Sequence, residues 1–209
     1  MAKKIQQPSR KSRMNSARPV VIIICDGTKT EPIYFKNFDK RDRPLDVKVV
    51  SSGKNYFDLI KKGIHEKKGV ESKCTVWCVS DVDADPNTPN YEASKNDQLK
   101  KYAKRAKEEG FQIAISNPCF ELWYLLHFDC YTGLMPTFKS VEKKLNGAAH
   151  LPGYDKTKDY FTALSDKLDD AINNANKLKQ YHEGLGVSDF MCVSTNPYTD
   201  VWQLVESIR

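Results

Sequence analysis

Acidic side chains directly follow two apolar runs of this sequence. Val20–Cys25 is followed by Asp26, and Cys74–Val79 is followed, one residue later, by Asp81 and Asp83. Short β-branched runs bounded by turn residues are typical of parallel strands that are buried on both faces. Because ligands gather beyond the carboxyl ends of such strands, we expect the three acids to share one crevice. Close carboxylates repel one another unless a cation neutralises them, and an all-oxygen ligand set favours Mg²⁺ or Mn²⁺.

The two acids of the second run form a D-x-D pattern. Residues two apart in an extended segment project to the same side, so Asp81 and Asp83 could share one cation or bind neighbouring ions. The pattern also occurs in surface turns, and it gains weight here from the preceding strand and from Asp26. Asp85 continues the spacing, but it precedes Pro86, which favours a role in a turn or a helix cap.

Four further residues lie where they could reach the same crevice. Gly27 and Lys29 are in the loop after the first run, and a lysine there could contact a phosphate as a point charge or simply be solvated. Asn117 and Glu121 follow another apolar run and would face the crevice if a helix begins there. The alternative for them is a capping Asn and a surface Glu. His127 lies in an apolar helix and is interpreted as a packed core histidine in preference to a catalytic one.

Strand-like and helix-like segments alternate along the chain, which predicts an α/β fold with a parallel sheet and right-handed crossovers. The expected strands are residues 19–25, 46–50, 74–79, 111–116 and 190–193. The expected helices are residues 30–40, 55–67, 91–109, 119–128, 139–145, 160–183 and 199–207. Thr30 is a plausible N-cap for the first of these helices.

The positive charge of the chain is concentrated at its beginning. The protein has 209 residues and a net charge of +6, and residues 1–18 contain six basic residues and no acid. These basic residues are Lys3, Lys4, Arg10, Lys11, Arg13 and Arg18. The segment is predicted to be a disordered tail that attracts phosphate backbones or, alternatively, only solubilises the terminus. The remainder, residues 19–209, is nearly neutral and fits a single domain.

Composition excludes several classes of protein. No apolar run approaches the roughly 20 residues that span a bilayer, and the beginning of the chain has no apolar signal segment, so no membrane partner is expected. The six cysteines contain no C-x-x-C pair, and Cys74 and Cys78 lack partners with zinc-ligand spacing. We therefore expect reduced core cysteines in a cytoplasmic protein.

Four segments, in this order, resemble the RloB-like family. They are VIIICDGTKTEPIYF at 21–35, SDVDAD at 80–85, NPCFELWYLLHF at 117–128 and STNPYTDVWQLVESI at 194–208. The resemblance covers nearly all of the chain after the tail. That family is similar to the Toprim superfamily, the metal-dependent catalytic domain of topoisomerases, primases and some phage-defence nucleases. The resemblance implies a Toprim-like, Rossmann-like domain with a short parallel sheet flanked by helices, and with additional C-terminal helices.

The same resemblance implies a function. It indicates a Mg²⁺-dependent endonuclease that hydrolyses phosphodiesters of DNA or RNA in antiphage defence or abortive infection. It also suggests an ATPase partner from a defence operon and a homodimer. By this resemblance Asp26 takes the general acid or base position, and Asp81 and Asp83 take the positions that bind Mg²⁺.

Position 26 departs from the pattern, because the resembling proteins usually carry Glu there. Asp26 retracts the carboxylate by about 1.5 Å, and a displacement of about that size can cost roughly a hundredfold in rate. Asp26 could therefore act through a water or serve only as a metal ligand. Glu31, in the first turn of the expected helix, is a possible substitute for the acid.

Two other classes of function remain open. Asp26 with the following Gly and Thr is similar to the D-x-D-G-T motif of a class of phosphatases, but Ile24 stands where their nucleophilic Asp would be. The second is a non-catalytic component of a defence system that binds a nucleotide or a partner protein. The acid at position 26 and metal binding by the D-x-D pattern would separate a nuclease from such a component.

Overall fold

A five-stranded sheet forms the centre of the protein in a computed structural model that describes residues 18–39, 44–53, 55–84, 87–147 and 150–209. The strands are β1 (Val20–Cys25), β2 (Asp46–Ser51), β3 (Cys74–Asp81), β4 (Gln112–Asn117) and β5 (Tyr198–Thr199). Their order is β2-β1-β3-β4-β5, with the first four parallel and β5 antiparallel to β4. The expectation of an α/β fold with a mostly parallel sheet is confirmed, whereas its likeness to Toprim domains stays a prediction.

The strand order places a topological switch at β1. From β1 the chain crosses to β2 on one side and then returns to β3 on the other, so β1 lies between its two successors. In sheets of this type the crevice for ligands opens at such a switch, beyond the carboxyl ends of the strands. Asp26 directly follows β1 and Asp81 ends β3, so both residues lie at this position.

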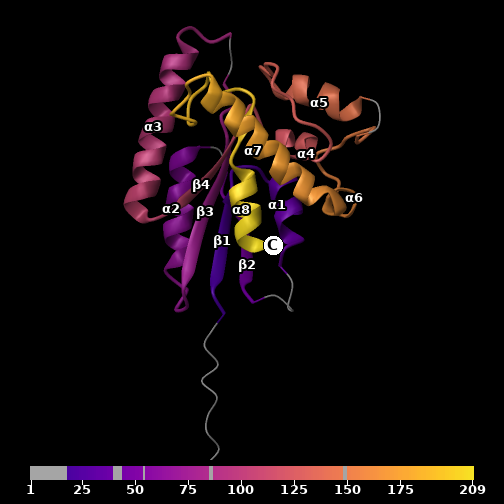
Figure 1. Ribbon diagram of the computed structural model, residues 1–209. Helices are drawn as coiled ribbons and strands as arrows, with labels where there is room; N and C mark the ends of the chain where they lie inside the picture. Colours follow the sequence, from indigo (N-terminus) through magenta and orange to yellow (C-terminus); the bar gives the residue numbers. More distant parts are fainter. Residues whose placement is uncertain (1–17, 40–43, 54, 85–86, 148–149) are drawn as a thin grey trace, which may run out of the picture.

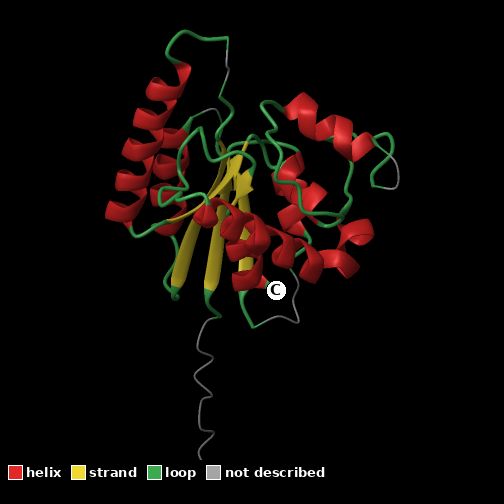
Figure 2. Ribbon diagram, turned by 45° about the horizontal axis from the view of Figure 1, so that its top comes forward, coloured by secondary structure: helices red, strands yellow, loops and turns green. Residues whose placement is uncertain are grey.

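Helices cover both faces of the sheet (Figures 1 and 2). They are α1 (Thr30–Lys36), α2 (Tyr56–Lys67), α3 (Tyr91–Glu109), α4 (Glu121–Leu126), α5 (Phe138–Asn146), α6 (Phe161–Leu164), α7 (Leu168–Gly184) and α8 (Val201–Ile208), with a short 3-10 turn at Ser165–Lys167. Side chains of β1 alternate between the faces, as the period of a strand requires. Ile22 and Ile24 pack in one core cluster with residues of α2 and α3, and Ile23 packs in the other with residues of α1, α4, α7 and α8.

The long expected helix over residues 160–183 is divided. Phe161–Leu164 is a single turn of α-helix, the 3-10 turn follows, and α7 begins only at Leu168. The first expected helix is also shorter than predicted, since it ends at Lys36, and Thr30 is its first helical residue and not its cap. The terminal helix begins at Val201.

The strand expected at residues 190–193 does not form. This segment is irregular, and the place beside β4 is taken by the two-residue strand β5, in which Thr199 pairs with Ser116. Asp200 extends the contact, because its backbone N–H donates to the Ile115 carbonyl at 2.9 Å. With that edge of β4 occupied, the apolar residues 190–193 have no strand to pair with.

Candidate functional site

The ends of β1 and β3 are joined by a hydrogen bond from backbone to carboxylate. The Asp81 N–H donates to Asp26 Oδ2 at 3.2 Å, and the Asp26 N–H donates to the Val79 carbonyl at 3.2 Å. The side chain at one strand end is therefore held by the backbone of the neighbouring strand. Asp26 and Asp81 converge at the carboxyl end of the sheet, as expected from their position after adjacent strands.

Asp83 reaches the same place by a different route from the one predicted. The backbone at Asp83 is left-handed, with φ of 43°, so the D-x-D segment is not extended throughout. The Val82 N–H donates to the Ser116 carbonyl at 2.8 Å and the Asp83 N–H to the Pro118 carbonyl at 3.2 Å, which turns the chain at the end of β3. Aspartate tolerates this conformation better than most residues. The exposed Asp83 side chain lies beside Asp81 because of this bend and not because of strand alternation.

Two hollows meet at these acids. The larger, of about 300 Å³, is called the lysine hollow and is lined by Asp26, Gly27, Thr28, Lys29, Thr30, Glu31, Gly53, Asp81, Glu121 and Lys156. The smaller, of about 140 Å³, is called the Tyr56 hollow and is lined by Asp26, Asn55, Tyr56, Asp81, Asp83, Lys95 and Gln98. Asp26 and Asp81 line both hollows, whereas Glu31 and Glu121 line only the first and Asp83 only the second.

Glu31 forms a carboxyl pair with Asp26. It lies in the first turn of α1, and only 6% of it is exposed. Burial and then the nearby charge of Asp26 raise the pKa of Glu31 to about 8. The hydrogen bond between the two side chains raises the pKa of Glu31 and lowers that of Asp26, which favours the proton on Glu31. The residue considered as a substitute for Asp26 is thus its direct neighbour.

Gly27 leaves room for this pair. A Cβ atom at position 27 would lie 2.7 Å from Glu31 Oε1, closer still to Oε2 and 2.8 Å from Cδ, so its three nearest neighbours all belong to the Glu31 carboxyl. Such distances are far shorter than van der Waals contact. The glycine therefore permits the Glu31 carboxyl to lie against the loop that follows β1.

Glu121 is, with Glu31, one of the two buried glutamates of the lysine hollow, and it accepts several contacts. It is the first residue of α4 and is 2% exposed. Its Oε1 accepts a hydrogen bond from the Tyr154 hydroxyl at 2.9 Å and a longer one from Thr30 Oγ1 at 3.4 Å. Lys156 Nζ lies 3.4 Å from the same oxygen. Glu121 is therefore a paired anion, unlike the surface Glu that was the alternative.

Two lysines line this hollow, and only one of them was a candidate from the sequence. Lys29 lies in the loop after β1 as predicted, and its side chain is exposed. Lys156 comes from the segment between α5 and α6, and its Nζ also lies 3.7 Å from the centroid of the Phe138 ring. No local motif marks Lys156, because its position depends on how the α5–α6 segment folds back over α4.

Burial and nearby like charges disfavour the charged forms of the carboxyl groups at the strand ends. Burial, followed by the charges of Asp26 and Glu31, raises the pKa of Asp81 well above its ordinary value, and burial also raises the pKa of Asp26. Asp81 Oδ1 is buried and has no hydrogen-bond partner among the described residues. An unpaired buried oxygen and like charges at one point are what a bound cation would neutralise.

The donor set fits Mg²⁺ or Mn²⁺ in its chemistry, because Asp26, Asp81 and Asp83 offer only hard oxygen ligands. Across the described ranges, however, no three His, Cys, Asp or Glu side chains are grouped closely enough to hold a metal ion. The acids lie next to one another along two hollows, and their side chains would have to move closer together to coordinate one ion. The predicted cofactor therefore stays a prediction.

Two other sequence candidates lie apart from the acids. Asn117 differs from the expectation, because its Nδ2 donates to the carbonyls of Val193 at 2.9 Å and Thr195 at 2.8 Å, away from both hollows. It anchors the irregular segment before β5. His127 is buried in the core, its Nδ1 lies 2.9 Å from the Trp123 carbonyl, and burial lowers its pKa to about 4. This agrees with the interpretation of His127 as a core residue.

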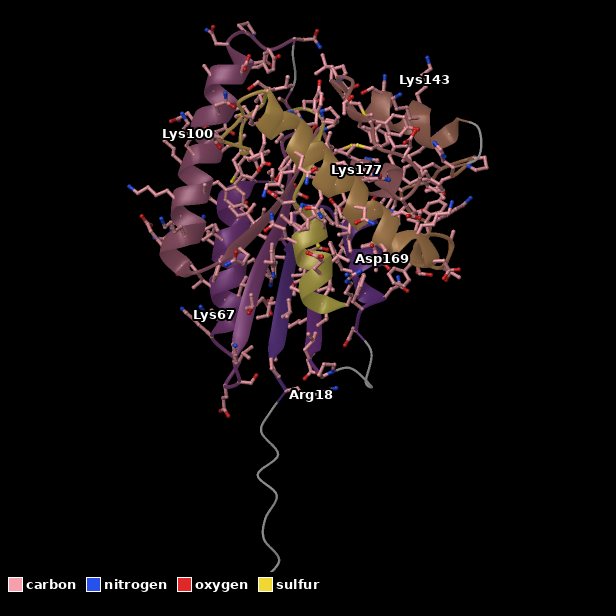
Figure 3. The ribbon with its side chains drawn as sticks, viewed as in Figure 1. Arg18, Lys67, Lys100, Lys143, Asp169 and Lys177 are labelled. Carbon is pink, nitrogen blue, oxygen red and sulfur yellow. The ribbon has the colours of Figure 1, made fainter. Side chains whose placement is uncertain are left out.

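Arg18, the one described residue of the basic segment, lies at the opposite end of the sheet from the acids. Residues 1–17, and with them Lys3, Lys4, Arg10, Lys11 and Arg13, lie outside the described residues, as does Asp85. Arg18, which Figure 3 labels, forms an ion pair with Asp46, and the two residues lie at the amino ends of β1 and β2. A strand of six residues is about 20 Å long, so Arg18 lies at a distance of that order from the acids.

None of the helices in the described part of the chain is long and apolar enough to cross a membrane. All six cysteines lie in described residues and are free thiols.

Comparison with known proteins agrees with the resemblance found in the sequence. No curated protein and no solved structure matches the chain. The family described as RloB-like protein matches residues 21–208, which is nearly the whole chain. The chain therefore belongs to the RloB-like family.

Proposed function

We propose that this protein is a metal-dependent nuclease that hydrolyses phosphodiester bonds of DNA or RNA. The observation that carries the proposal is the pairing of Asp26 with Asp81 at the switch point of a parallel sheet, between two hollows that each contain lysine. Carboxylates beside cations suit a polyanionic substrate, because the acids hold a metal ion while the lysines attract the phosphates. Membership of the RloB-like family supports the same reading.

Each residue of the site has its own role in this hydrolysis. Asp26, Asp81 and Asp83 would hold Mg²⁺ or Mn²⁺, which supplies positive charge for the phosphoryl oxygens and lowers the pKa of water. Water attacks phosphorus, the bond from phosphorus to the leaving oxygen breaks, and the proton that the water loses passes to the solvent, from which Glu31 is later reprotonated. Glu31, the protonated member of the Asp26 pair, gives its proton to that leaving oxygen. Lys29 and Lys156 bind non-bridging oxygens of the phosphates at the lysine hollow.

The wider role of the protein rests on the family resemblance. It supports a Toprim-like active site and a function in antiphage defence or abortive infection. An ATPase partner from a defence operon and a homodimer stay predictions, as do the cytoplasmic location expected from the cysteine content and the binding of nucleic acid by the tail.

A second candidate function is a non-catalytic module that binds a nucleotide or a partner protein. One observation favours it, namely that no metal-binding group of three is formed within the described ranges. In such a module the acids would be neutralised by protons, in agreement with the raised pKa values of Asp26, Glu31 and Asp81. Metal binding and cleavage separate this candidate from the nuclease.

The decisive test is cleavage of a panel of single-stranded and duplex DNAs and RNAs in Mg²⁺, in Mn²⁺ and in EDTA. We expect cleavage in the metal-containing reactions alone, and none by the Asp81→Ala/Asp83→Ala variant at equal folded concentration. Calorimetric titration with Mn²⁺ provides a second readout, in which the variant should bind weakly or not at all. A parent protein that neither cleaves any member of the panel nor binds Mn²⁺ would reject the nuclease in favour of the non-catalytic module.

The Gly27→Ala variant should lose activity without losing stability. The added methyl group overlaps the Glu31 carboxyl, which is the mobile end of a side chain and can move aside. A displacement of about 1 Å can cost roughly a hundredfold in rate, so we expect a fall in kcat of about that size with little change in Tm. Gly69→Ala is the matched control, because a Cβ there meets no atom within 4 Å. If Gly27→Ala cleaves like Gly69→Ala, the position of the Glu31 carboxyl does not matter for catalysis.

A further inference from the structure

The two hollows lie over opposite faces of the sheet and have only Asp26 and Asp81 in common. The lysine hollow is built against α1 and α4, whereas the Tyr56 hollow is built against α2 and α3. In Figure 1, α2 and α3 lie on one side of the strands and α1 and α4 on the other. The acids therefore stand between two open spaces, and a long ligand could enter both.

Lys95 is the cation of the Tyr56 hollow. It projects from α3, it is only partly exposed, and its Nζ lies 5.3 Å from the centroid of the Tyr56 ring. No carboxylate of the described residues lies within ion-pair distance of it. Burial lowers the pKa of Lys95 even though the charges of Asp83 and Asp26 act in the opposite direction. An ammonium group that is partly removed from water and has no paired anion provides a site for one.

Tyr56 ties this cation to the end of β3. Its hydroxyl donates to the Asp81 carbonyl at 2.9 Å, and its ring stacks on Tyr102 with centroids 4.7 Å apart and planes 10° from parallel. Tyr56 is itself buried at the start of α2. The Tyr56 ring, over which the Lys95 ammonium group lies, is thus held by a hydrogen bond to the backbone of Asp81. This contact keeps the ammonium group close to the acids.

Charge explains what such an arrangement would bind. The acids alone would repel a phosphate, but positive charge lies beyond them on both sides, at Lys29 in one hollow, where Lys156 is paired with Glu121, and at Lys95 in the other. A single phosphate can occupy only one hollow. A nucleic-acid strand carries a phosphate at every nucleotide and can place one in each hollow while a third lies over the acids.

We propose that the Tyr56 hollow binds a phosphate of the substrate strand on the side of the scissile bond opposite to the lysine hollow, with Lys95 as its cation. This inference rests on the proposed nuclease function and specifies its substrate. The bond that is cut is internal and has a phosphate on each side, so the enzyme acts as an endonuclease on a strand that crosses the carboxyl edge of the sheet.

Binding of a labelled single-stranded oligonucleotide by the full-length protein tests this, with Ca²⁺ in place of Mg²⁺ and DNA and RNA compared. Lys95→Gln should lower the affinity and reduce the slope of log affinity against log salt by about 0.7, the value for one lost phosphate contact on a single strand. Lys100→Gln is the control with the same change of charge on the same helix (Figure 3). Residues five apart in a helix point about 140° away from each other. Lys95→Arg should bind like the parent, because it keeps the charge.

A neutral methylphosphonate moved along the oligonucleotide locates the contact. At one linkage the substitution should weaken binding by the parent but not by Lys95→Gln, because that contact is already lost. The inference is overturned if Lys95→Gln binds the oligonucleotide no more weakly than Lys100→Gln does. It is also overturned if no linkage shows this difference between the parent and Lys95→Gln. Cleavage in Mg²⁺ is measured separately. If the parent cleaves and Lys95→Gln has no specific effect, the nuclease proposal stands and the phosphate contact at Lys95 is rejected. If Lys95→Gln has a specific effect but the parent does not cleave, the phosphate contact at Lys95 stands and the nuclease proposal is rejected.

Discussion

The Asp81→Asn variant is expected to be more stable than the parent in EDTA and to be inactive in Mg²⁺. Asp81 Oδ1 is buried without a partner among the described residues, and burial and neighbouring acids disfavour the charged form of this carboxyl. The amide of Asn has no charge to bury, and its N–H groups can donate to the carboxylate of Asp26. Leaving a buried polar group unpaired costs about 1–3 kcal/mol, and each kcal/mol corresponds to about 2–4 °C in Tm for a chain of this size.

The same change should abolish metal-dependent cleavage. The variant loses an anionic ligand that lines both hollows, and electrostatic contributions of this kind are typically worth about 10²–10³ in kcat. Thermal unfolding in EDTA and initial rates in Mg²⁺ measure the two effects. Asp97→Asn is the control, because this exposed acid forms only a surface ion pair with Lys101 and its loss should change neither quantity appreciably. A variant that is both less stable and inactive would indicate a purely structural role for Asp81.

The Glu31→Gln variant should lose most of its activity while keeping its affinity for metal. Glu31 is the protonated partner of Asp26, so Gln preserves a neutral side chain that can still donate a hydrogen bond. It cannot release a proton, and general acid catalysis is worth about 10²–10⁴ in rate. We therefore expect a fall in kcat within that range, with an unchanged metal concentration for half-maximal activity.

Asp26→Asn provides the contrast, since it removes a charge that would bind the metal. It should raise the metal concentration that is needed, as well as lowering the rate. Glu71→Gln, at an exposed position, controls for the loss of a glutamate elsewhere. If Glu31→Gln instead shifts the metal requirement as Asp26→Asn does, Glu31 is a ligand and not the acid. If Asp26→Asn cleaves like the parent, position 26 has no catalytic role.

The central part of the candidate site could be predicted because it depends on local pattern and topology. The apolar runs that became β1 and β3 end directly before or at Asp26 and Asp81, and neighbouring parallel strands bring their carboxyl ends together whatever else the chain does. Glu31 could be identified because it lies in the first turn of the helix that follows β1. The conformation of Asp83 could not, since the left-handed bend depends on hydrogen bonds to Ser116 and Pro118.

The C-terminal part of the chain was harder to predict. Residues 190–193 have the composition of a strand, but β5 occupies the edge of β4. The side chain of Asn117 then binds the carbonyls of Val193 and Thr195, which a ladder would otherwise have used. Neither the competition for one strand edge nor the hydrogen bonds of a side chain 76 residues away are visible in the local sequence.

The sequence by itself determined the α/β class, the positions of the main strands and the acids at their ends, because hydrophobic periodicity and parallel topology are properties of short segments. Apart from Lys29, only the tertiary structure decided which cations face those acids. Lys156 arrives on the α5–α6 segment and Lys95 on α3, and neither belongs to a motif. Their places follow from how helices pack on the two faces of the sheet, which depends on contacts between residues far apart in the chain.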